Sequence, residues 1–275
     1  MSGVTTDMAA YWDRAGRVWV EQQALLDRLY QPIAKAVADR ADLRAGEAVL
    51  DVGCGAGATT FEAAWRVGPE GRAVGADISG ALLELARRRA GEQALEGVDF
   101  VHADAQTHAF GQDFDAIVSR FGVMFFPDPV AAFANLRRAL KPGGRLAFVC
   151  WRGPEDNAIA QVPLEAAAPF ISEVPRFERN APGRFGFADA ERVRLILAEA
   201  GWRDITIEPL DDPTPVSFEE LLTMSLRVGP LNPILSNADE TLRARVREAV
   251  TAALSPYVKD GVAQMNSACW LVTAR

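Results

Sequence analysis

The sequence predicts an α/β fold built on a mostly parallel β-sheet. Between Ala48 and Trp151, short apolar or β-branched runs alternate with helical patterns, which is the order of elements in βαβ units. A glycine-rich loop follows the first of these runs and leads directly into a helical pattern. Hydrophobic residues make up 49% of the 275 positions, which is enough to bury such a sheet between layers of helices.

The elements of this central region follow one another closely. Five strands are expected at Ala48–Val52, Arg72–Asp77, Val98–His102, Phe114–Ser119 and Arg145–Trp151. Helices are expected at Thr59–Val67, after Ser79 as N-cap, and after Asp128-Pro129, an N-cap followed by a first-turn proline. Lys141-Pro142-Gly143-Gly144 should end the last helix and turn the chain into the fifth strand.

The flanking segments are predicted to be mostly helical. Before the central region, residues 11–40 should form two helices broken at Gln31-Pro32. The elements expected after it are a helix over Asn157–Phe170, an ordered loop over Ile171–Phe187, a helix capped by Asp189 and closed by Gly201, a strand over Trp202–Glu208, two helical stretches between Pro209 and Gly261 split at Gly229-Pro230, and a last strand over Ala268–Ala274.

Composition and charge argue against several classes of partner. The formal net charge is −8, and Lys and Arg form no stripe that could follow a phosphate backbone, so nucleic acid is not expected as a partner. The densest basic run, Arg87 to Arg89, lies near a predicted helix end, where positive charge favours the helix dipole. No apolar stretch is as long as a membrane span, so no membrane partner is expected. Nothing in the sequence indicates an oligomeric state.

The cysteines and the N-terminus bear on the cell compartment. Cys54, Cys150 and Cys269 lie in apolar or glycine-rich runs, with no CxxC or Cys/His ligand spacing, so we expect reduced, buried thiols and no metal site. The N-terminal residues lack a basic stretch followed by an apolar one, the pattern typical of a secretion signal. The expected location is the cytoplasm.

The loop from Asp51 to Ala58 has the sequence DVGCGAGA. Its three glycines, Gly53, Gly55 and Gly57, allow a sharp turn and a close approach of the backbone to a ligand, and the amide groups at the start of the next helix favour a negatively charged group. The same loop also satisfies the dinucleotide-binding pattern, and it could be a tight turn with no ligand. The loop alone leaves the ligand open.

Acidic residues around the loop narrow the choice of ligand. Asp77 ends the second predicted strand twenty residues after Gly57, where a carboxylate can accept hydrogen bonds from both ribose hydroxyls of an adenosine-containing cofactor. Asp51 places negative charge where a nicotinamide dinucleotide would have its pyrophosphate, so a cationic cofactor suits the loop better. No tyrosine has a lysine four residues later, as many short-chain dehydrogenases do. An NAD(P)-dependent oxidoreductase is therefore the less favoured alternative.

The motifs between Ala48 and Trp151 resemble those of the class I S-adenosylmethionine-dependent methyltransferases. Five segments match in the family's order: VLDVGCGAG, GADIS, VHADAQ, FDAIVSRFGVMFF and LKPGGRLAFVCW. The resemblance implies a Rossmann-like sheet of seven strands in the order 3-2-1-4-5-7-6, with residues 268–274 as its antiparallel seventh strand, helices on both faces and a helical cap. It also implies S-adenosyl-L-methionine as the cofactor.

The resemblance assigns part of the cofactor to the glycine loop and its acidic neighbours. Gly53, Gly55 and Gly57 would run beneath the methionine and ribose portions. Asp51 would help to hold the amino acid end, and Asp77 would bind the ribose hydroxyls.

Residues after the second, third and fourth predicted strands would contact the adenine and the methionine end of the cofactor. Ile78 would pack on the adenine face, Asp104 would accept a hydrogen bond from the adenine amine, and the Ala105 backbone would read the ring edge. Arg120 and Phe121 match positions that often line the methionine end, although an arginine side chain is atypical there, so only the backbone of Arg120 is carried over.

The N-terminal pattern YWDRAGRVW resembles the helical caps of small-molecule methyltransferases. An aromatic face attracts a sulfonium cation by about 0.5–2 kcal/mol, which makes Trp19 a candidate cofactor contact; that Trp12 and Trp19 simply pack the cap onto the sheet is equally open. His108, in a loop after Asp104 at the carboxyl edge of the sheet, is a weak candidate for a general base, whereas His102 alternates within a strand and is expected to be structural.

The sequence thus predicts a methyltransferase that acts by in-line displacement on a small, partly apolar organic acceptor. Residues 1–45 would form the N-terminal helical cap, 46–151 the cofactor-binding core, and 152–275 the rest of the sheet with acceptor-binding cap insertions, all in one catalytic domain. Besides the oxidoreductase, a second alternative stays open: a methyltransferase-like protein that binds the cofactor without methyl transfer. The acceptor, and whether its oxygen, nitrogen or carbon is methylated, is not encoded in any motif.

Overall fold

The computed structural model describes residues 3–175, 177–178 and 180–275, so two residues of the expected loop over 171–187, Arg176 and Arg179, lie outside the described residues. The chain divides into two compact units. The first comprises Met1–Trp151, Asn180–Pro209 and Cys269–Arg275, and the second comprises Arg152–Arg179 and Leu210–Ala268.

The sheet has the strand order β3-β2-β1-β4-β5-β8-β6, and a two-residue strand, β7, pairs with β8 alone. The strands are β1 (Ala48–Val52), β2 (Arg72–Asp77), β3 (Val98–His102), β4 (Phe114–Arg120), β5 (Leu140–Trp151), β6 (Thr206–Ser217), β7 (Val258–Lys259) and β8 (Val262–Ala274). Pairing is parallel from β3 through β5, and β8 runs antiparallel to β5 with Trp151 opposite Cys269. With the unexpected β7 set aside, this is the predicted order with an antiparallel last strand.

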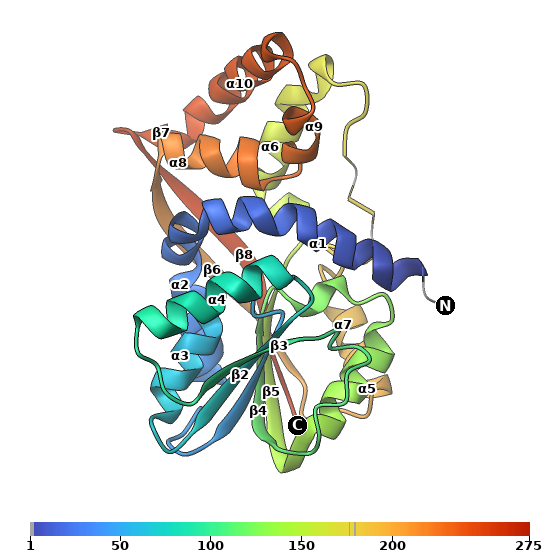
Figure 1. The fold of residues 1–275 in the computed structure, drawn as a ribbon. Helices are drawn as coiled ribbons and strands as arrows, with labels where there is room; N and C mark the ends of the chain where they lie inside the picture. The colour runs from blue at the N-terminus through green and yellow to red at the C-terminus, as the bar shows by residue number, and fades with distance from the viewer. Residues whose placement is uncertain (1–2, 176, 179) are drawn as a thin grey trace. The chain divides into compact units, whose positions relative to one another are not determined.

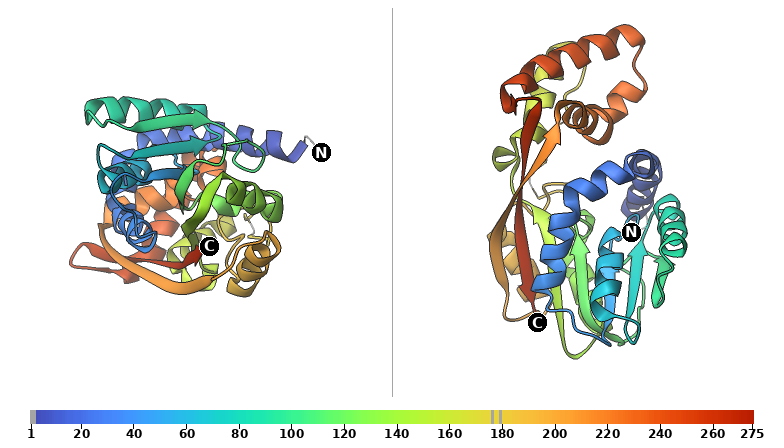
Figure 2. Two further views of the ribbon diagram at one scale, coloured as in Figure 1. Left: turned by 90° about the horizontal axis from the view of Figure 1, so that it is seen from below. Right: turned by 90° about the vertical axis from the view of Figure 1, so that its left-hand side faces the viewer.

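Helices cover both faces of the sheet in the first unit (Figures 1 and 2). On one face lie α2 (Gln23–Arg40), α3 (Ala58–Val67) and α4 (Gly80–Glu92); on the other lie α5 (Pro129–Ala139) and α7 (Ala190–Glu199). Because both faces are covered, every residue of β1 is buried, as expected for a central parallel strand. The predicted α/β class is confirmed.

The N-terminal helices break at a different residue from the one predicted. α1 (Gly3–Glu21) ends before Gln22, and Pro32, the expected break, lies inside α2. A proline within a helix removes one backbone hydrogen bond, but its fixed φ is compatible with helical backbone. Leu29 and Ile33, which precede and follow Pro32 in α2, are fully buried. Tertiary packing therefore keeps the helix intact through the proline.

Three helix N-caps were predicted, and all three residues occupy that position. Asp128 accepts a hydrogen bond from the Ala131 amide at 3.0 Å, and Asp189 accepts one from the Glu191 amide at 3.0 Å. Ser79 is the N-cap of α4, as predicted, but its side chain makes no cap hydrogen bond. Its hydroxyl lies 3.5 Å from the carbonyl oxygen of Trp12 on α1 instead.

Strand ends differ from the predictions where prolines and glycines obscure the pattern. β5 begins at Leu140, five residues before Arg145, with a register shift against β4 where the Pro-Gly-Gly turn was expected. β6 covers Thr206–Ser217 and not Trp202–Glu208; its PLDDPTPVS segment suggested a loop. β6 ends the strand order, and an edge strand tolerates proline because one row of its amides needs no partner.

The second unit consists mainly of helices. They are α6 (Ala158–Ala167), α8 (Phe218–Thr223), a π-helical turn at Met224–Val228, α9 (Asn232–Ser236) and α10 (Glu240–Leu254). The predicted break at Gly229-Pro230 is confirmed, and the helical stretches around it are shorter and more numerous than expected. α6 packs against α10, whose Val246, Val250 and Leu254 are fully buried.

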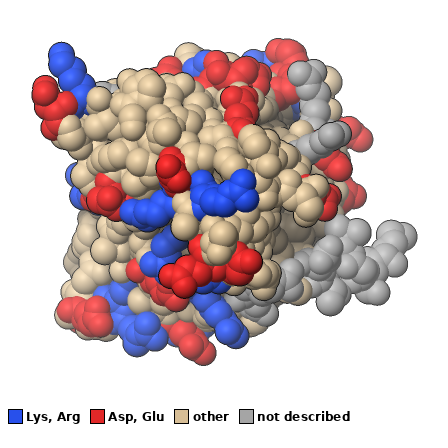
Figure 3. Space-filling model, turned by 90° about the horizontal axis from the view of Figure 1, so that it is seen from above, with Lys and Arg blue, Asp and Glu red and all other residues tan. Residues whose placement is uncertain are grey.

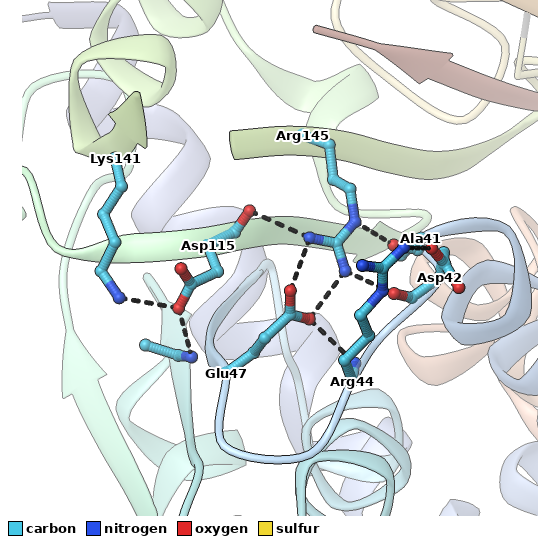
Figure 4. Close-up of polar contacts among 8 residues, drawn as sticks. Ala41, Asp42, Arg44, Glu47, Asp115, Lys141 and Arg145 are labelled. Carbon is cyan, nitrogen blue, oxygen red and sulfur yellow. Dashed lines mark hydrogen bonds and ion pairs between the residues drawn. The ribbon is translucent and has the colours of Figure 1, made fainter. Parts of the chain in front are cut away.

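A polar network ties the amino ends of the central strands together (Figure 4). Arg145 on β5 makes a bidentate pair with Glu47, at 2.9 and 2.7 Å, and also donates to the carbonyls of Ala41 and Asp42. Asp115 on β4 accepts from the Ala48 amide and from Lys141, both at 2.8 Å. The polar side chains of this network are therefore already paired within the protein.

Candidate functional site

A pocket lies at the carboxyl ends of β1, β2 and β4, with an empty volume of about 1200 Å³ that includes the part open to solvent. All residues that line it belong to the first unit. They come from α1 (Met8, Trp12, Trp19), α2 (Gln23, Leu26, Asp27, Tyr30), the glycine loop with the start of α3 (Val52–Ala56, Ala58, Thr59), the end of β2 and α4 (Ala76–Ile78, Leu82), the turn after β3 (Ala103–Ala105) and the segment after β4 (Arg120–Gly122, Phe125–Pro127). The carboxyl ends of parallel strands are where α/β sheets bind ligands.

The three loop glycines have positive φ, which side chains other than glycine adopt only at a cost, and they differ in what surrounds them. A Cβ on Gly53 would lie 2.6 Å from the Cα of Gly122, so the loops after β1 and β4 touch there. A Cβ on Gly55 would meet nothing within 4 Å. Gly57 caps α3 and faces Phe61, and it does not line the pocket. Gly55 is therefore the glycine whose side faces free space.

Asp77 holds the glycine loop as well as lining the pocket. Its Oδ2 accepts a hydrogen bond from the Gly55 amide and its Oδ1 accepts one from the Ser79 amide, both at 2.8 Å. Burial raises the pKa of Asp77, against the effect of these amides. Each carboxylate oxygen retains a further lone pair, so the side chain can also accept from a ligand.

Asp51 lies beneath the pocket and does not line it. The residue is 1% exposed; its Oδ2 accepts from the Thr60 hydroxyl at 2.7 Å, and its Oδ1 has no hydrogen-bond partner among the described residues. Burial raises its pKa to about 7, although the Thr60 hydrogen bond and the Arg120 charge oppose the shift. The site thus contains a buried carboxyl oxygen that still lacks a donor.

The residues predicted to meet adenine come together at one side of the pocket. Ile78, Asp104 and Ala105 all line it. Asn135 donates to the Ala105 carbonyl at 3.0 Å, so the amide is the backbone group of Ala105 that can meet a ligand. His102 Nε2 lies 2.8 Å from the Ile78 carbonyl oxygen, which agrees with its expected structural role.

His108 does not reach the pocket. Its side chain is exposed and packs edge-on against Phe110, with ring centroids 4.7 Å apart, and the residue is not among those that line the site. The structure therefore gives no support to His108 as a base. Asn135 donates to its backbone carbonyl at 2.8 Å, which fixes the loop that carries it.

The methionine end of the predicted site contains Arg120 and Phe121, and both residues line the pocket. Phe121 has a φ of +64°, a strained value for a residue with a side chain. Arg120 donates to the Tyr30 carbonyl at 3.1 Å, and burial lowers its pKa. The guanidinium is thus held against Tyr30, another residue that lines the pocket.

Aromatic side chains of α1 form one wall of the pocket. Trp12 and Trp19 both line it, and their ring centroids are 5.8 Å apart in an edge-to-face arrangement. Trp12 also packs edge-on against Phe125, at 5.0 Å. The expected contribution of Trp19 to the pocket is present, and Trp12 shares it.

An ion pair that the sequence did not reveal links the cap to the glycine loop. Arg89 on α4 pairs with Asp27 on α2 and donates to the Ala56 carbonyl. The sequence suggested only a helix-dipole role for Arg87–Arg89, because nothing local indicates a partner 62 positions away.

The described part of the chain contains neither a group of metal ligands nor a membrane-spanning helix. Over residues 3–175, 177–178 and 180–275, no three His, Cys, Asp or Glu side chains are grouped so that they could hold a metal ion. No helix in the same residues combines the length and apolar character of a membrane span.

Comparisons with known proteins place this site in a wider context. A family model described as "Methyltransferase domain" matches residues 49–144. The chain is 34% identical over 145 residues to aklanonic acid methyltransferase DauC of Streptomyces sp. (strain C5), covering 51% of this chain and 66% of that protein. It is 38% identical over 122 residues to the ubiquinone/menaquinone biosynthesis C-methyltransferase UbiE of Marinomonas sp. (strain MWYL1), covering 44% of this chain and 49% of that one. The match spans less than two thirds of either relative.

Solved structures share the fold at low sequence identity. The [4+2]-cyclase SpnF has a TM-score of 0.57 and 22% identity, with 94% of each chain covered. Phosphoethanolamine N-methyltransferase 2 of Haemonchus contortus, solved in complex with S-adenosyl-L-methionine, has a TM-score of 0.56 and 18% identity, covering 89% of this chain and 52% of that one. At these identities the likeness shows the fold alone.

Proposed function

We propose that the chain is a class I S-adenosylmethionine-dependent methyltransferase that transfers the methyl group of this cofactor to a small organic acceptor. The observation that carries the proposal is the pocket itself. It brings an open glycine, two carboxylates and an aromatic wall together from four separate stretches of the sequence, in the order that the family motifs require.

The residues of the pocket fit the cofactor in two respects. The unpartnered Oδ1 of Asp51 is a buried acceptor that suits the ammonium of an amino acid, and the free space beside Gly55 suits a ligand lying against the backbone. When bound, the cofactor supplies an activated methyl group on a sulfonium. We propose that Gly53 and Gly55 support its methionine and ribose portions and that Asp77 binds the ribose hydroxyls. Gly57, which was expected to share this role, caps α3 outside the pocket lining.

The other predicted contacts follow the same arrangement. Ile78, Asp104 and Ala105 are proposed to receive the adenine, since all three line one side of the pocket. Arg120 and Phe121 are proposed to line the methionine end. Trp19 would offer its ring to the sulfonium, where an aromatic face favours a cation by about 0.5–2 kcal/mol.

Catalysis in this proposal rests on alignment and on exclusion of water. The bound cofactor would supply the methyl carbon for an in-line displacement by the acceptor atom, with the sulfur keeping the electron pair of the bond that it loses. Holding the acceptor aligned can supply about 7–11 kcal/mol of effective molarity. In this proposal the aromatic wall of Trp12 and Trp19 lies over the bound cofactor and helps to exclude water from it.

An exposed histidine outside the pocket should contribute little to this reaction. We therefore expect His108→Asn to leave the rate of S-adenosylhomocysteine formation within about a factor of three, well below the 10²–10⁴-fold of a general base. Steady-state kinetics across pH 6–9 measures this. A hundredfold loss, with one limb of the pH profile removed, would identify His108 as the base after all.

The acceptor is proposed to be a small, partly apolar molecule and not a nucleic acid. The two relatives named above are described as acting in aklanonic acid methylation and in quinone biosynthesis, both of which concern small organic molecules. Charged side chains of both signs are intermixed on the face shown in Figure 3, without a basic patch that could follow phosphates.

We also propose that residues 152–275 supply the acceptor-binding insertions and that the protein is cytoplasmic. The three free, buried cysteines support the cytoplasmic location.

A methyltransferase-like protein without methyl transfer is the second candidate function. The likeness to a structure described as a [4+2]-cyclase favours it, because the same fold carries another reaction there. An NAD(P)-dependent oxidoreductase is the third candidate function, and only the glycine pattern of the loop supports it.

Calorimetry and a mass-shift screen together separate the three candidates. We expect S-adenosylmethionine and S-adenosylhomocysteine to bind and NAD not to bind. Binding of NAD with neither sulfur nucleoside would replace the proposal by the oxidoreductase. A library of metabolites is then incubated with S-adenosylmethionine and read for products heavier by one methyl group; binding without any conversion to S-adenosylhomocysteine would favour the second candidate.

A further inference from the structure

Arg184 is a largely buried cation that pairs with no anion among the described residues. Its Nε is fully buried and has no hydrogen-bond partner within that part of the chain, and no carboxylate there forms an ion pair with it. The guanidinium carbon lies 4.1 Å from the centre of the Trp151 ring and 5.5 Å from that of Phe185. Burial lowers its pKa, and an arginine nevertheless stays protonated in proteins. A buried charge with no partner is costly, so a site that retains one is suited to receive the partner from outside.

The turn that carries Arg184 is held firmly. The Gly183 amide donates to the Met124 carbonyl at 3.0 Å, and the Gly186 amide donates to the Gly183 carbonyl at 2.9 Å. Arg192 donates to the Gly186 carbonyl at 2.8 Å. A Cβ on Gly186 would lie 2.9 Å from the Met124 oxygen, so the turn sits directly on the segment after β4. The backbone that carries the guanidinium is thus held in place by contacts within the protein.

The surroundings of Arg184 continue into the wall of the pocket. Trp151 stacks on Phe121 with ring centroids 4.4 Å apart and planes 9° apart. Tyr30 packs edge-on against both rings, at 5.4 Å from Phe121 and 5.9 Å from Trp151. Tyr30 and Phe121 line the pocket. Arg184 therefore lies against the same aromatic cluster that bounds the proposed cofactor site.

Arg184 and Arg120 face different neighbours. Arg120 interacts electrostatically with Asp27 and Asp51, which belong to the cofactor end of the pocket. Arg184 interacts instead with Tyr30, Cys269 and Tyr11, and not with either carboxylate of the glycine-loop region. A carboxylate on the cofactor would find Arg120 first. The free cation of Arg184 is left for a second ligand.

We propose that Arg184 binds an anionic oxygen of the methyl acceptor, a carboxylate or an ionised hydroxyl carried on an aromatic scaffold. This inference rests on the proposed function, since it takes the second ligand of the site to be the acceptor. The guanidinium supplies charge-assisted hydrogen bonds, and Phe121, which stacks on Trp151 and lines the pocket, supplies the aromatic surface against which a ligand ring can pack. A neutral or cationic acceptor would leave the buried charge unpaired and is disfavoured.

The test uses 1-naphthoate and its neutral amide, 1-naphthamide, as probes of the full-length protein saturated with S-adenosylhomocysteine. Titration calorimetry should give naphthoate at least tenfold higher affinity than naphthamide, which is about 1.4 kcal/mol. Arg184→Gln should remove this preference, and Arg184→Lys should retain part of it. Arg203→Gln, which changes an exposed arginine of the same unit, is the control and should retain all of it.

Equal affinity of the wild-type protein for naphthoate and naphthamide would overturn the proposal, and this comparison needs no substitution, so it decides the matter even if a variant fails to fold. A tenfold loss of S-adenosylhomocysteine affinity in Arg184→Gln would also overturn it, because the guanidinium would then serve the cofactor carboxylate. If S-adenosylhomocysteine does not bind the wild-type protein, the proposed function fails. Titration of naphthoate into the ligand-free protein then tests the anion site by itself.

Discussion

At the scale of single residues, Gly53 and Gly55 have similar backbone angles but different surroundings. A methyl group on Gly53 would collide with the Gly122 backbone, whereas one on Gly55 would enter free space on the pocket side. Gly55→Ala should therefore cost about 1–2 kcal/mol of folding free energy from its positive φ and weaken S-adenosylhomocysteine binding about tenfold or more. Gly53→Ala should destabilise the protein by more, because the two loops must separate.

Urea denaturation and calorimetry on both variants check this pair. Each variant is the control for the other, since the change in side chain is the same. Gly55→Ala with unaltered S-adenosylhomocysteine affinity would mean that the ligand does not lie against the loop.

The titration of Asp51 predicts a pH dependence. Its folded pKa of about 7 lies above the value of about 3.9 for an unfolded aspartate, so the folded state holds the proton more tightly. The resulting stability is complete below about pH 4 and is lost as the pH rises through 7. Asp51→Asn should flatten this part of the stability profile of the ligand-free protein.

The same titration should favour cofactor binding at high pH. The charged groups around Asp51 are Arg120 and Asp77, and the bound ammonium would meet its free Oδ1. Since the ionised fraction rises from about one tenth at pH 6 to about nine tenths at pH 8, S-adenosylhomocysteine affinity should rise about tenfold over that range. Asp51→Asn should show no such rise. A flat wild-type profile would place the ammonium elsewhere.

The residues that the sequence could predict are those whose chemistry is local. Asp77 and Asp104 follow strands at fixed distances from a glycine loop, and the pocket receives both. Asp51 and Gly57 also belong to the loop motif, but neither lines the pocket. A sequence motif does not show which of its residues are buried behind the others. Arg184 and Arg89 act through partners far away in the sequence, so no local signal identifies them. His108 was suggested by its loop alone, and the structure does not bring its ring to the pocket.

At the scale of elements, α1 should matter for ligand binding more than for folding of the sheet. It contributes three side chains to the pocket and packs on α4, where Gly16 lies against Ser79 and Leu82. Deleting residues 2–21 should leave the secondary structure of the sheet intact and lower S-adenosylhomocysteine affinity at least tenfold. The deletion must stop there, because Leu26 and Leu29 of α2 are buried in the core.

Circular dichroism and calorimetry measure the two effects. The double variant Trp12→Ala, Trp19→Ala retains the helix and removes its rings, so a similar loss of affinity would assign the effect to the aromatic wall. Full affinity in the deleted protein would show that α1 is not a cover for the site.

Element boundaries were harder to predict than element types. Pro32 suggested a helix break, yet the packing of α2 on the sheet overrides the proline. The prolines of β6 suggested a loop, yet an edge strand accommodates them. Both errors have the same cause: whether a helix or strand accommodates a proline depends on its packing and on its place in the sheet, and these are known only once the neighbouring elements are placed.

At the scale of the whole molecule, the two ends of the sheet in the first unit have separate tasks. The carboxyl ends of its strands form the pocket, and the amino ends carry the network of Arg145, Glu47 and Asp115 (Figure 4). Side chains in the pocket are held ready for a ligand, whereas those of the network are already paired. Changes at the amino end should therefore alter stability without altering binding.

Arg145→Met tests this separation. The side chains of Arg145 and Glu47 are each 17% exposed. Fully exposed ion pairs contribute under about 1 kcal/mol, and breaking a buried pair costs about 3–5 kcal/mol. For this partly buried pair we expect a loss of about 2 kcal/mol in the free energy of unfolding. Lys141→Met, which breaks the more exposed pair with Asp115, should cost less than about 1 kcal/mol and is the matched control. Urea denaturation measures both losses, and calorimetry with S-adenosylhomocysteine should show unchanged affinity in each variant. Equal losses in the two variants would contradict the role given to the buried pair, and weakened cofactor binding would show that the two ends of the sheet are coupled.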